Sequence, residues 1–318
     1  MRYLVTGVSG FVSGYFIEHI SKADPNNEIW GIDIREPADS LLNLCASLHF
    51  FKMSLLDRGA LRSLLKEFRP DRVVHLAAYS SVAYSWENPV ESFLNNTNIF
   101  LNLVEAIREV ALDCRILSVG SSEEYGQVSQ GDLPLSETRC PTPFNPYAVA
   151  RVSQEHLSKV YAQGYGLSVL CTRSFNHIGP GQIDTYVVSS LVRQAIEIAH
   201  GLRDVIVCGE LKIVRDFIDV RDAVRAYALI LEKGVSGQVY NVCSGSGISL
   251  YGLLKKISEM TGILLEITTD VSLIRPLDNP IIVGDNSKLA ALGFKREYDL
   301  DRTLSDLIEW WKKKYAIN

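Results

Sequence analysis

The chain has 318 residues, of which 47% are hydrophobic, and this suggests about two domains with a sizeable buried core. Its formal net charge of −5 argues against binding to nucleic acid or to an anionic membrane, so local groups have to hold any anionic ligand. We expect a cytoplasmic protein, because strand-like sequence begins at Arg2 and no apolar run approaches the roughly 18 residues of a membrane span. The six cysteines are scattered without a CxxC pair, which favours free thiols over a metal site.

The first segment is typical of a dinucleotide-binding fold. Residues 2–6 (RYLVT) predict a buried strand, and the run TGVSGFVSG then leads into a helix. Gly7 allows the tight turn between them, and Gly10 lets the backbone approach a pyrophosphate. The first turn of the helix, at Phe11 and Val12, would receive that pyrophosphate on its free amide groups.

An acidic residue lies at the end of the second predicted strand, residues 28–34. Asp33 stands where a carboxylate accepts a hydrogen bond from the ribose 2′-OH of NAD. The same charge would repel the 2′-phosphate of NADP, so NAD(H) is the favoured cofactor. Arg35 follows two residues later and keeps NADP(H) possible.

Two later strands complete the predicted sheet around the cofactor. Residues 71–78 (DRVVHLAA) predict a central parallel strand. Apolar residues at its end, and one after a third predicted strand at about 48–53, would lie close to the cofactor: Leu76, Ala77, Ala78 and Leu55. Residues 115–120 predict the next strand, which places Ser121 at its C-terminal end, where ligands bind in open α/β sheets.

A tyrosine and an arginine four residues apart follow in the next helix. Pro146 fits the start of that helix, so Tyr147 and Arg151 share one of its faces. A phenol has a pKa of about 10 and is a poor acid–base group at neutral pH, but a fixed cation beside it stabilises the phenolate. We therefore predict that Ser121, Tyr147 and Arg151 meet over a nicotinamide ring.

Strands and helices alternate regularly up to about residue 173 and less regularly afterwards. The pattern predicts an α/β fold with a Rossmann-type doubly wound parallel sheet and a smaller, interleaved C-terminal α/β domain. We assign residues 1–173 and about 213–243 to the dinucleotide-binding domain. The substrate domain would take about 174–212 and 244–318.

Four longer motifs stand out in the chain: GSSEEYG (120–126), SFNHIGPGQ (174–182), VRDFIDVRD (214–222) and YNVCSG (240–245). Together they resemble the extended short-chain dehydrogenase/reductase family of nucleotide-sugar enzymes. The resemblance covers nearly the whole chain. Within the family the chain looks most like the reductases of GDP-4-keto-6-deoxy-D-mannose.

The resemblance implies roles for individual residues. Ser121 matches the catalytic Ser/Thr of the family, Tyr147 matches its acid–base tyrosine, and Arg151 stands where the family almost always has lysine. Six residues match positions at the sugar, its diphosphate or the nucleotide: Ser122, Glu123, Asn176, Gln182, Arg215 and Arg275. The guanidinium groups among them suit phosphate oxygens.

The activity implied is NAD(P)H-dependent reduction of the C4 ketone of a nucleotide-linked, preferably GDP-linked, 4-keto-6-deoxy sugar. Tyr147 would donate the proton, and Ser121 would hydrogen-bond the same oxygen. Glu123 leaves an alternative open, because 4,6-dehydratases keep at this position the base that removes the C5 proton; an epimerase or a C4 dehydrogenase would use the same site. The family also implies a homodimer formed by the helices near 90–110 and 147–165.

Four positions depart from the family pattern near the cofactor. Ser13 replaces the third glycine of the loop, Ser54 an acidic residue, Ile99 a glycine and Arg151 a lysine. These departures motivate a further alternative, a weakened non-catalytic homologue that still binds the cofactor.

Overall fold

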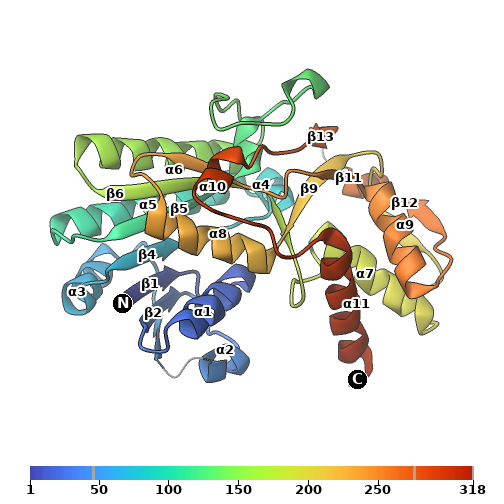
Figure 1. Ribbon diagram of the computed structural model, residues 1–318, viewed down its shortest axis with the longest axis horizontal. Helices are drawn as coiled ribbons and strands as arrows, with labels where there is room; N and C mark the ends of the chain where they lie inside the picture. The colour runs from blue at the N-terminus through green and yellow to red at the C-terminus, as the bar shows by residue number, and fades with distance from the viewer. Residues whose placement is uncertain (45–46, 275–276, 317–318) are drawn as a thin grey trace.

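The computed structural model describes residues 1–44, 47–274 and 277–316. Within these residues, seven parallel strands form one central sheet in the order β10-β6-β5-β4-β1-β2-β3 (Figure 1). The strands are β1 (Arg2–Thr6), β2 (Glu28–Asp33), β3 (Leu48–Lys52), β4 (Arg72–His75), β5 (Arg115–Ser121), β6 (Ser168–Ser174) and β10 (Val239–Val242). The order reverses between β1 and β4, and ligands of doubly wound sheets bind at such a switch point. The Rossmann-type fold predicted from the sequence is confirmed.

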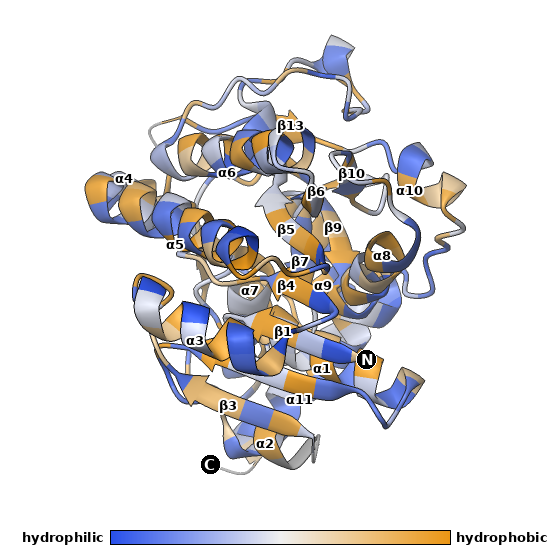
Figure 2. Cartoon of the chain, turned by 90° about the vertical axis from the view of Figure 1, so that its left-hand side faces the viewer, coloured by the Kyte–Doolittle hydropathy of each residue, from blue (hydrophilic) through white to orange (hydrophobic). Residues whose placement is uncertain are grey.

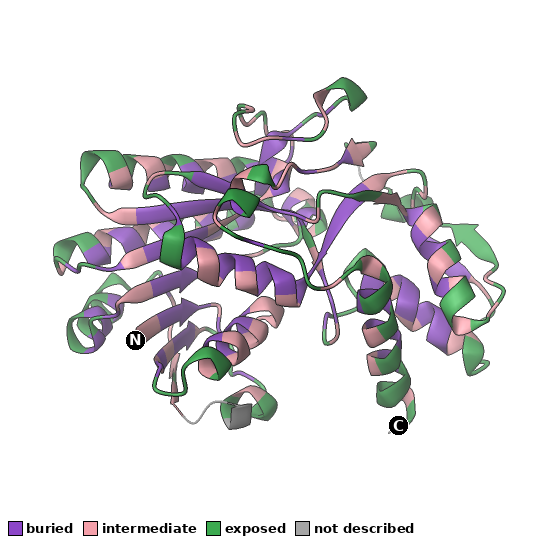
Figure 3. Cartoon of the chain, viewed as in Figure 1, coloured by how far each residue is buried: buried purple, intermediate pink, exposed green. Residues whose placement is uncertain are grey.

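Helices cover both faces of the central sheet. On one face lie α1 (Phe11–Ala23) and α8 (Val220–Lys233). On the other face lie α3 (Arg58–Phe68), α5 (Pro89–Glu109) and α6 (Pro146–Gly164). Figure 2 shows the apolar strands β4 and β5 between α5 and α8. The sheet is largely buried, whereas the outward sides of the helices are exposed (Figure 3).

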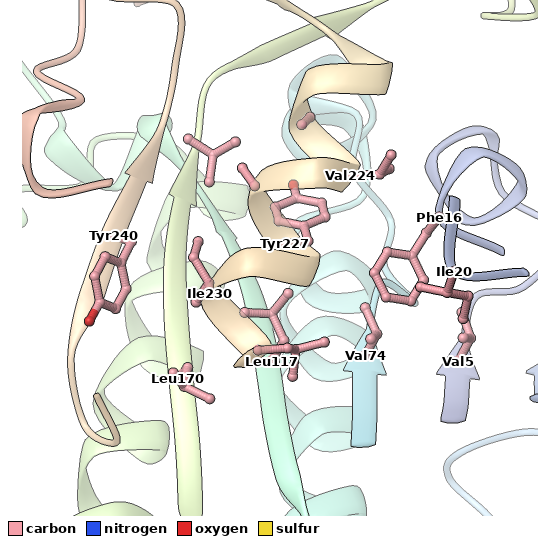
Figure 4. Close-up of a cluster of buried hydrophobic side chains, with 14 of the residues drawn as sticks. Val5, Phe16, Ile20, Val74, Leu117, Leu170, Val224, Tyr227, Ile230 and Tyr240 are labelled. Carbon is pink, nitrogen blue, oxygen red and sulfur yellow. The ribbon is translucent and has the colours of Figure 1, made fainter. Parts of the chain in front are cut away.

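Successive strand residues point into two different hydrophobic cores. Val5, Val74 and Leu117 contribute to the core under α1 and α8, which Figure 4 shows. Their chain neighbours contribute to the core under α3, α5 and α6: Leu4, Val73 and Ile116. Because both faces of each strand are covered, the strands are continuous apolar runs in the sequence instead of alternating ones.

A second, smaller unit follows the large sheet and lies to the right in Figure 1. Its strands are β7 (Asn176–Ile178), β8 (Ile206–Cys208), β9 (Val214–Asp219), β11 (Gly247–Ser249), β12 (Ile267–Thr269) and β13 (Ile281–Ile282). Its helices α7 (Val187–Ala199), α9 (Leu250–Thr261) and α11 (Leu300–Ala316) enclose a third core that contains Leu191, Leu253 and Trp311.

The remaining helices are short and join the longer elements. They are α2 (Asp39–Leu44), α4 (Val82–Glu87), α10 (Ser287–Ala291) and the 3-10 turns η1 (Ser122–Tyr125), η2 (Gln130–Asp132) and η3 (Val271–Leu273). Among all the helices of the described residues, none has both the length and the apolar character needed to cross a bilayer.

Strand β9 pairs outside the central seven-stranded sheet. The predicted domain ranges place 213–243 with the dinucleotide-binding unit, but β9 pairs with β7, β11 and β13 in the smaller unit. Helix α8 and strand β10, which follow it, pack on the large sheet. The apolar pattern of a strand identifies the strand but not its partner, so sequence periodicity could not reveal this crossing. The domain boundaries themselves stay a prediction.

Candidate active site

Two backbone segments approach so closely at position 7 that only glycine fits there. Its φ of +72° favours glycine, and a Cβ atom there would lie 2.7 Å from both the N and the Cα of Ala77. Gly10 is the N-cap of α1 and provides no side-chain cap to the helix. The first amide groups of α1, including those of Phe11 and Val12, therefore remain available to an anion.

The Asp33 carboxylate lies over the glycine loop at the end of β2. Its Oδ2 accepts a hydrogen bond from the Ser9 amide at 3.1 Å, and its Oδ1 accepts from the Arg35 amide at 3.0 Å. The side chain of Arg35 is exposed, and its carbonyl accepts from Ser9 Oγ at 2.7 Å. The second lone pair of each carboxylate oxygen remains for a ribose hydroxyl, as the prediction requires.

The residues after β4 form the opposite wall of this loop. The Leu76 and Ala77 amides both donate to Thr6, at 3.2 Å to its carbonyl and 3.3 Å to its Oγ1. Ala78 follows them and is partly exposed, whereas Leu55 is 5% exposed and packs in the core under α3 and α5. Leu55 is therefore less accessible to a cofactor than Ala78. A dinucleotide therefore fits the site formed by the glycine loop, the N-terminus of α1 and Asp33.

Three of the departures from the family pattern have a structural explanation. Ser13 is 1% exposed, and its hydroxyl donates to the Gly7 carbonyl at 2.7 Å, so it braces the loop that a third glycine would leave open. Ile99 is 5% exposed and packs in the core beneath α5. Ser54 Oγ accepts from the Leu56 amide at 3.2 Å and so holds the turn after β3.

Ser121 ends strand β5 and caps the turn η1. Its Oγ accepts a hydrogen bond from the Glu123 amide at 3.2 Å, while its own amide donates to Glu124 Oε1 at 2.7 Å. Because Ser121 Oγ already acts as an acceptor, its proton is free to be donated to another oxygen. Ser122, which the resemblance assigns to the substrate, is only 4% exposed.

Asn145 connects this turn to the helix that carries Tyr147. Helix α6 begins at Pro146, and Asn145 Oδ1 caps it by accepting from the Ala148 amide at 2.8 Å. The Nδ2 of Asn145 donates to Glu123 Oε2 at 2.9 Å. The sequence analysis missed this buried residue, although an asparagine before a proline is a common helix start.

Arg151 lies against Tyr147, with its Cζ 5.1 Å from the centre of the ring. The guanidinium is 5% exposed, and its Nη1 donates to the Val119 carbonyl at 3.1 Å and to Gln154 Oε1 at 2.7 Å. Gln154 in turn donates from Nε2 to Ser118 Oγ at 2.8 Å. The sequence analysis also missed Gln154, which holds an arginine in place of the family's lysine.

His75 is a core residue beneath this site. Its Nδ1 lies 2.9 Å from Thr6 Oγ1. Burial, and secondarily the charge of Arg151, lowers the pKa of His75 from 6.5 to about 3. The imidazole is therefore neutral at physiological pH and does not supply a second cation to the site.

The loop after β6, which carries the predicted substrate residues, contacts helix α1. Asn176 is exposed on β7, whereas Gln182 is 4% exposed and donates from Nε2 to the His177 carbonyl at 2.7 Å. Tyr15 of α1 donates to the Pro180 carbonyl at 2.8 Å, which fixes the loop against the cofactor side. Asn176 is thus the more accessible of the two predicted contacts.

Arg215 is held by the chain's own oxygens. It is 6% exposed, donates to the Asn279 carbonyl at 2.8 Å and forms an ion pair with Asp278. A diphosphate would have to compete with that carboxylate. Arg275, the second arginine predicted for the nucleotide, lies outside the described residues.

The acidic residues of the VRDFIDVRD motif tie loops together. Asp216 accepts from the Ser244 and Gly245 amides at 2.8 and 3.0 Å. Asp222 is fully buried and accepts from the amides of residues 297 and 298. These acidic residues of the motif therefore have structural roles, because they hold neighbouring loops by hydrogen bonds. Among the described residues no cluster of His, Cys, Asp and Glu is arranged to hold a metal ion.

Known proteins are similar to this chain over almost its whole length. The model of the GDP-mannose 4,6 dehydratase family matches residues 4–307. GDP-6-deoxy-D-mannose reductase of Pseudomonas aeruginosa is 31% identical over 98% of this chain and 98% of the relative. GDP-6-deoxy-D-talose 4-dehydrogenase of Aggregatibacter actinomycetemcomitans is 30% identical over 91% of this chain and 90% of the relative.

Solved structures share the fold. RMD from Pseudomonas aeruginosa, complexed with NADPH, has a TM-score of 0.86 at 31% identity and aligns over 98% of this chain and 99% of its own. UDP-glucose 4-epimerase of Thermotoga maritima, with UDP-glucose, has a TM-score of 0.89 at 27% identity over 99% and 100%. Fold and site thus define an enzyme of the extended short-chain dehydrogenase/reductase type. The chain belongs to the GDP-mannose 4,6-dehydratase family, which confirms the family predicted from the sequence.

Proposed function

We propose that the protein reduces the C4 ketone of a GDP-linked 4-keto-6-deoxy sugar with a reduced nicotinamide cofactor. The observation that carries the proposal is the contact of Arg151 with Tyr147, in which Arg151 also binds the β5 carbonyl of Val119. Two of the relatives, a GDP-6-deoxy-D-mannose reductase and a GDP-6-deoxy-D-talose 4-dehydrogenase, support a GDP-linked deoxy sugar by their names.

Each residue of the site has a role in this reaction. Tyr147 donates a proton to the oxygen at C4 as negative charge develops there, and Arg151 stabilises the phenolate that remains. The Ser121 hydroxyl keeps its proton and donates a hydrogen bond to the same oxygen. When bound, the nicotinamide cofactor supplies the hydride to C4.

For the cofactor we propose a preference for NAD(H), with NADP(H) as an accepted alternative. The Asp33 carboxylate at the end of β2 supports NAD(H), since it accepts from a ribose hydroxyl and repels a 2′-phosphate. The exposed Arg35 side chain and the NADPH bound to RMD support the alternative. Measuring kcat/KM with NADH and with NADPH separates the two.

One assay tests the activity. The purified protein is incubated with GDP-4-keto-6-deoxymannose and NADH or NADPH, and the loss of reduced-nicotinamide absorbance is followed. Oxidation that depends on the sugar supports the proposal. A second incubation, with GDP-mannose alone, would give a keto sugar without net change of cofactor if the protein were a dehydratase. Tight cofactor binding without turnover of any sugar would favour the non-catalytic homologue.

A second candidate activity, 4,6-dehydration, is supported by the position of Glu123. Its partly exposed carboxylate is held by Asn145, one residue before the helix that carries Tyr147, where a base could act on the sugar. Glu123→Gln keeps an acceptor for Asn145 but removes the base. Loss of ketone formation from GDP-mannose in this variant, with ketone reduction retained, would assign a dehydratase step to Glu123.

The proposed assembly is a homodimer through α5 and α6, which pack side by side. Both helices expose large hydrophobic residues: Val90 at 70%, Phe93 at 37% and Leu94 at 50% on α5, and Val149 at 41% and Val160 at 54% on α6. We also propose a cytoplasmic location, which the buried free thiols of Cys114, Cys171, Cys208 and Cys243 support.

A further inference from the structure

A buried carboxyl group lies directly behind the proposed reacting serine. Glu124 is fully buried, and its Oε1 accepts from the Ser121 amide at 2.7 Å. Its Oε2 has no hydrogen-bond partner within the described part of the chain. Space for this carboxyl depends on Gly120, where a Cβ atom would lie only 2.3 Å from Glu124 Oε1. An unpartnered buried oxygen beside an active site needs an explanation.

A second buried carboxylate, that of Glu155, lies close to Glu124. Glu155 of α6 is 3% exposed and takes both arms of the Arg173 guanidinium, at 2.8 and 3.0 Å. Lys159 donates to the same carboxylate at 2.7 Å. Burial, followed by the charge of Glu155, raises the pKa of Glu124 well above its usual range. The raised pKa favours the protonated, uncharged form of Glu124 beside the charged Glu155.

We infer that Glu124 is a positioning residue that fixes Ser121 so that the serine hydroxyl points to the reacting oxygen. The inference rests on the proposed reductase function. Glu124 Oε1 holds the Ser121 amide, and the Glu124 carbonyl accepts from the Thr142 amide at 3.1 Å. The Glu124 side chain thus caps the start of η1, and its carbonyl connects the turn to Thr142.

An uncharged Glu124 favours the reaction in addition to positioning Ser121. Negative charge develops on the sugar oxygen that Ser121 contacts, and an ionised carboxylate behind Ser121 would oppose it. The adjacent charge, on Glu155, is paired with Arg173. The pair therefore holds Ser121 with an acceptor that carries no charge.

Two substitutions separate the positioning role from a merely structural one. Glu124→Gln keeps an oxygen for the Ser121 amide and offers an N–H group to Glu155, whereas Glu124→Leu keeps the volume and removes both. We expect Glu124→Leu to lower kcat for ketone reduction about 30-fold, less than the loss of a whole oxyanion donor. The KM for NADPH should change less than about twofold, because the contact acts in the transition state. Glu124→Gln should recover most of kcat.

Hydrogen exchange gives a readout that does not need activity. The Ser121 amide should be protected in the wild type and in Glu124→Gln and should exchange faster in Glu124→Leu. If the wild type reduces no keto sugar, the proposed function fails and the exchange pattern alone decides the hydrogen-bonding role. Circular dichroism and NADPH affinity check that each variant folds, and if Glu124→Leu does not, Glu124→Gln decides. Wild-type kcat in Glu124→Leu, or loss of kcat or of protection in Glu124→Gln, would overturn the inference.

Discussion

Tyr147 is the residue on which the proposed chemistry depends most directly. Tyr147 is 6% exposed and its ring lies against Arg151, so a fixed cation lies beside the phenol. Tyr147→Phe keeps the packing and removes the proton donor. We expect kcat to fall at least about 100-fold, within the usual range for general acids, while NADH or NADPH binding stays within about twofold. Retained turnover in this variant would reject the role of Tyr147.

Arg151 differs from lysine in how it is held. Its planar guanidinium binds Val119 and Gln154 at the same time, and lysine's single ammonium could not span both in the same geometry. The arginine therefore provides a permanent charge beside Tyr147 but has less freedom to follow a ribose hydroxyl. Gln154, 1% exposed, orients the arginine without touching the proposed substrate.

Buried histidines predict acid sensitivity. The folded-state pKa of His75 is about 3, below its ordinary 6.5, and His177 is lowered to about 4 by burial. Unfolding releases both side chains to bind protons below pH 6.5. Their stabilisation is therefore fully present above that pH and is lost as the pH falls toward 3, by about 1.4 kcal/mol per unit for His75 alone. Urea denaturation from pH 7 to 4 measures this slope.

Matched variants assign the slope to one residue. His75→Gln does not titrate and should reduce the pH dependence to the part that His177 and other groups contribute, whereas His49→Gln, at an exposed position on β3, should leave it as in the wild type. Equal slopes in wild type and His75→Gln would contradict the assignment.

At the scale of secondary structure, the ion pair of Arg173 and Glu155 joins strand β6 to helix α6. Both side chains are at most 3% exposed, and Arg173 also stacks 4.6 Å from the centre of the Tyr125 ring. Arg173→Met leaves the buried carboxylate without its main partner, so we expect the free energy of unfolding to fall by about 3–5 kcal/mol. Urea denaturation at pH 7 measures the change.

An exposed ion pair serves as the control for Arg173. Arg62 pairs with Glu109 between α3 and α5, and its side chain is 52% exposed. Arg62→Met should therefore cost less than about 1 kcal/mol. A loss in Arg173→Met no larger than this would mean that the buried pair adds nothing to stability.

For the whole molecule, the exposed hydrophobic residues of α5 and α6 predict self-association. Single exposed apolar side chains are normal on a protein, but here several gather on two neighbouring helices. Val160→Arg should weaken the proposed dimer at least about tenfold, because it places a charge in an apolar interface. Equilibrium sedimentation of the wild type and this variant measures the dissociation constant. Val235→Arg, at a 61% exposed position after α8, is the matched control, and a monomeric wild type would contradict the proposal.

The local features of the dinucleotide-binding unit were determined by the sequence alone. Continuous apolar runs identified β1, β4 and β5, since strands buried on both faces have no polar side. Gly7, Asp33 and the start of α6 at Pro146 were predictable because turn, strand end and helix start each depend on a few adjacent residues. The departure at Ser13 could be located in the sequence, but its bond to Gly7 could not.

Only the tertiary structure decided the contacts between distant segments. In the structure, β9 pairs in the smaller unit. Arg151 binds Gln154 next to β5, and Glu124 lies close to Glu155 behind Ser121. Sequence patterns report which side of an element is buried, because that follows from local periodicity. They do not report which charged groups share a buried space, and this sharing determines whether a carboxyl such as Glu124 holds its proton.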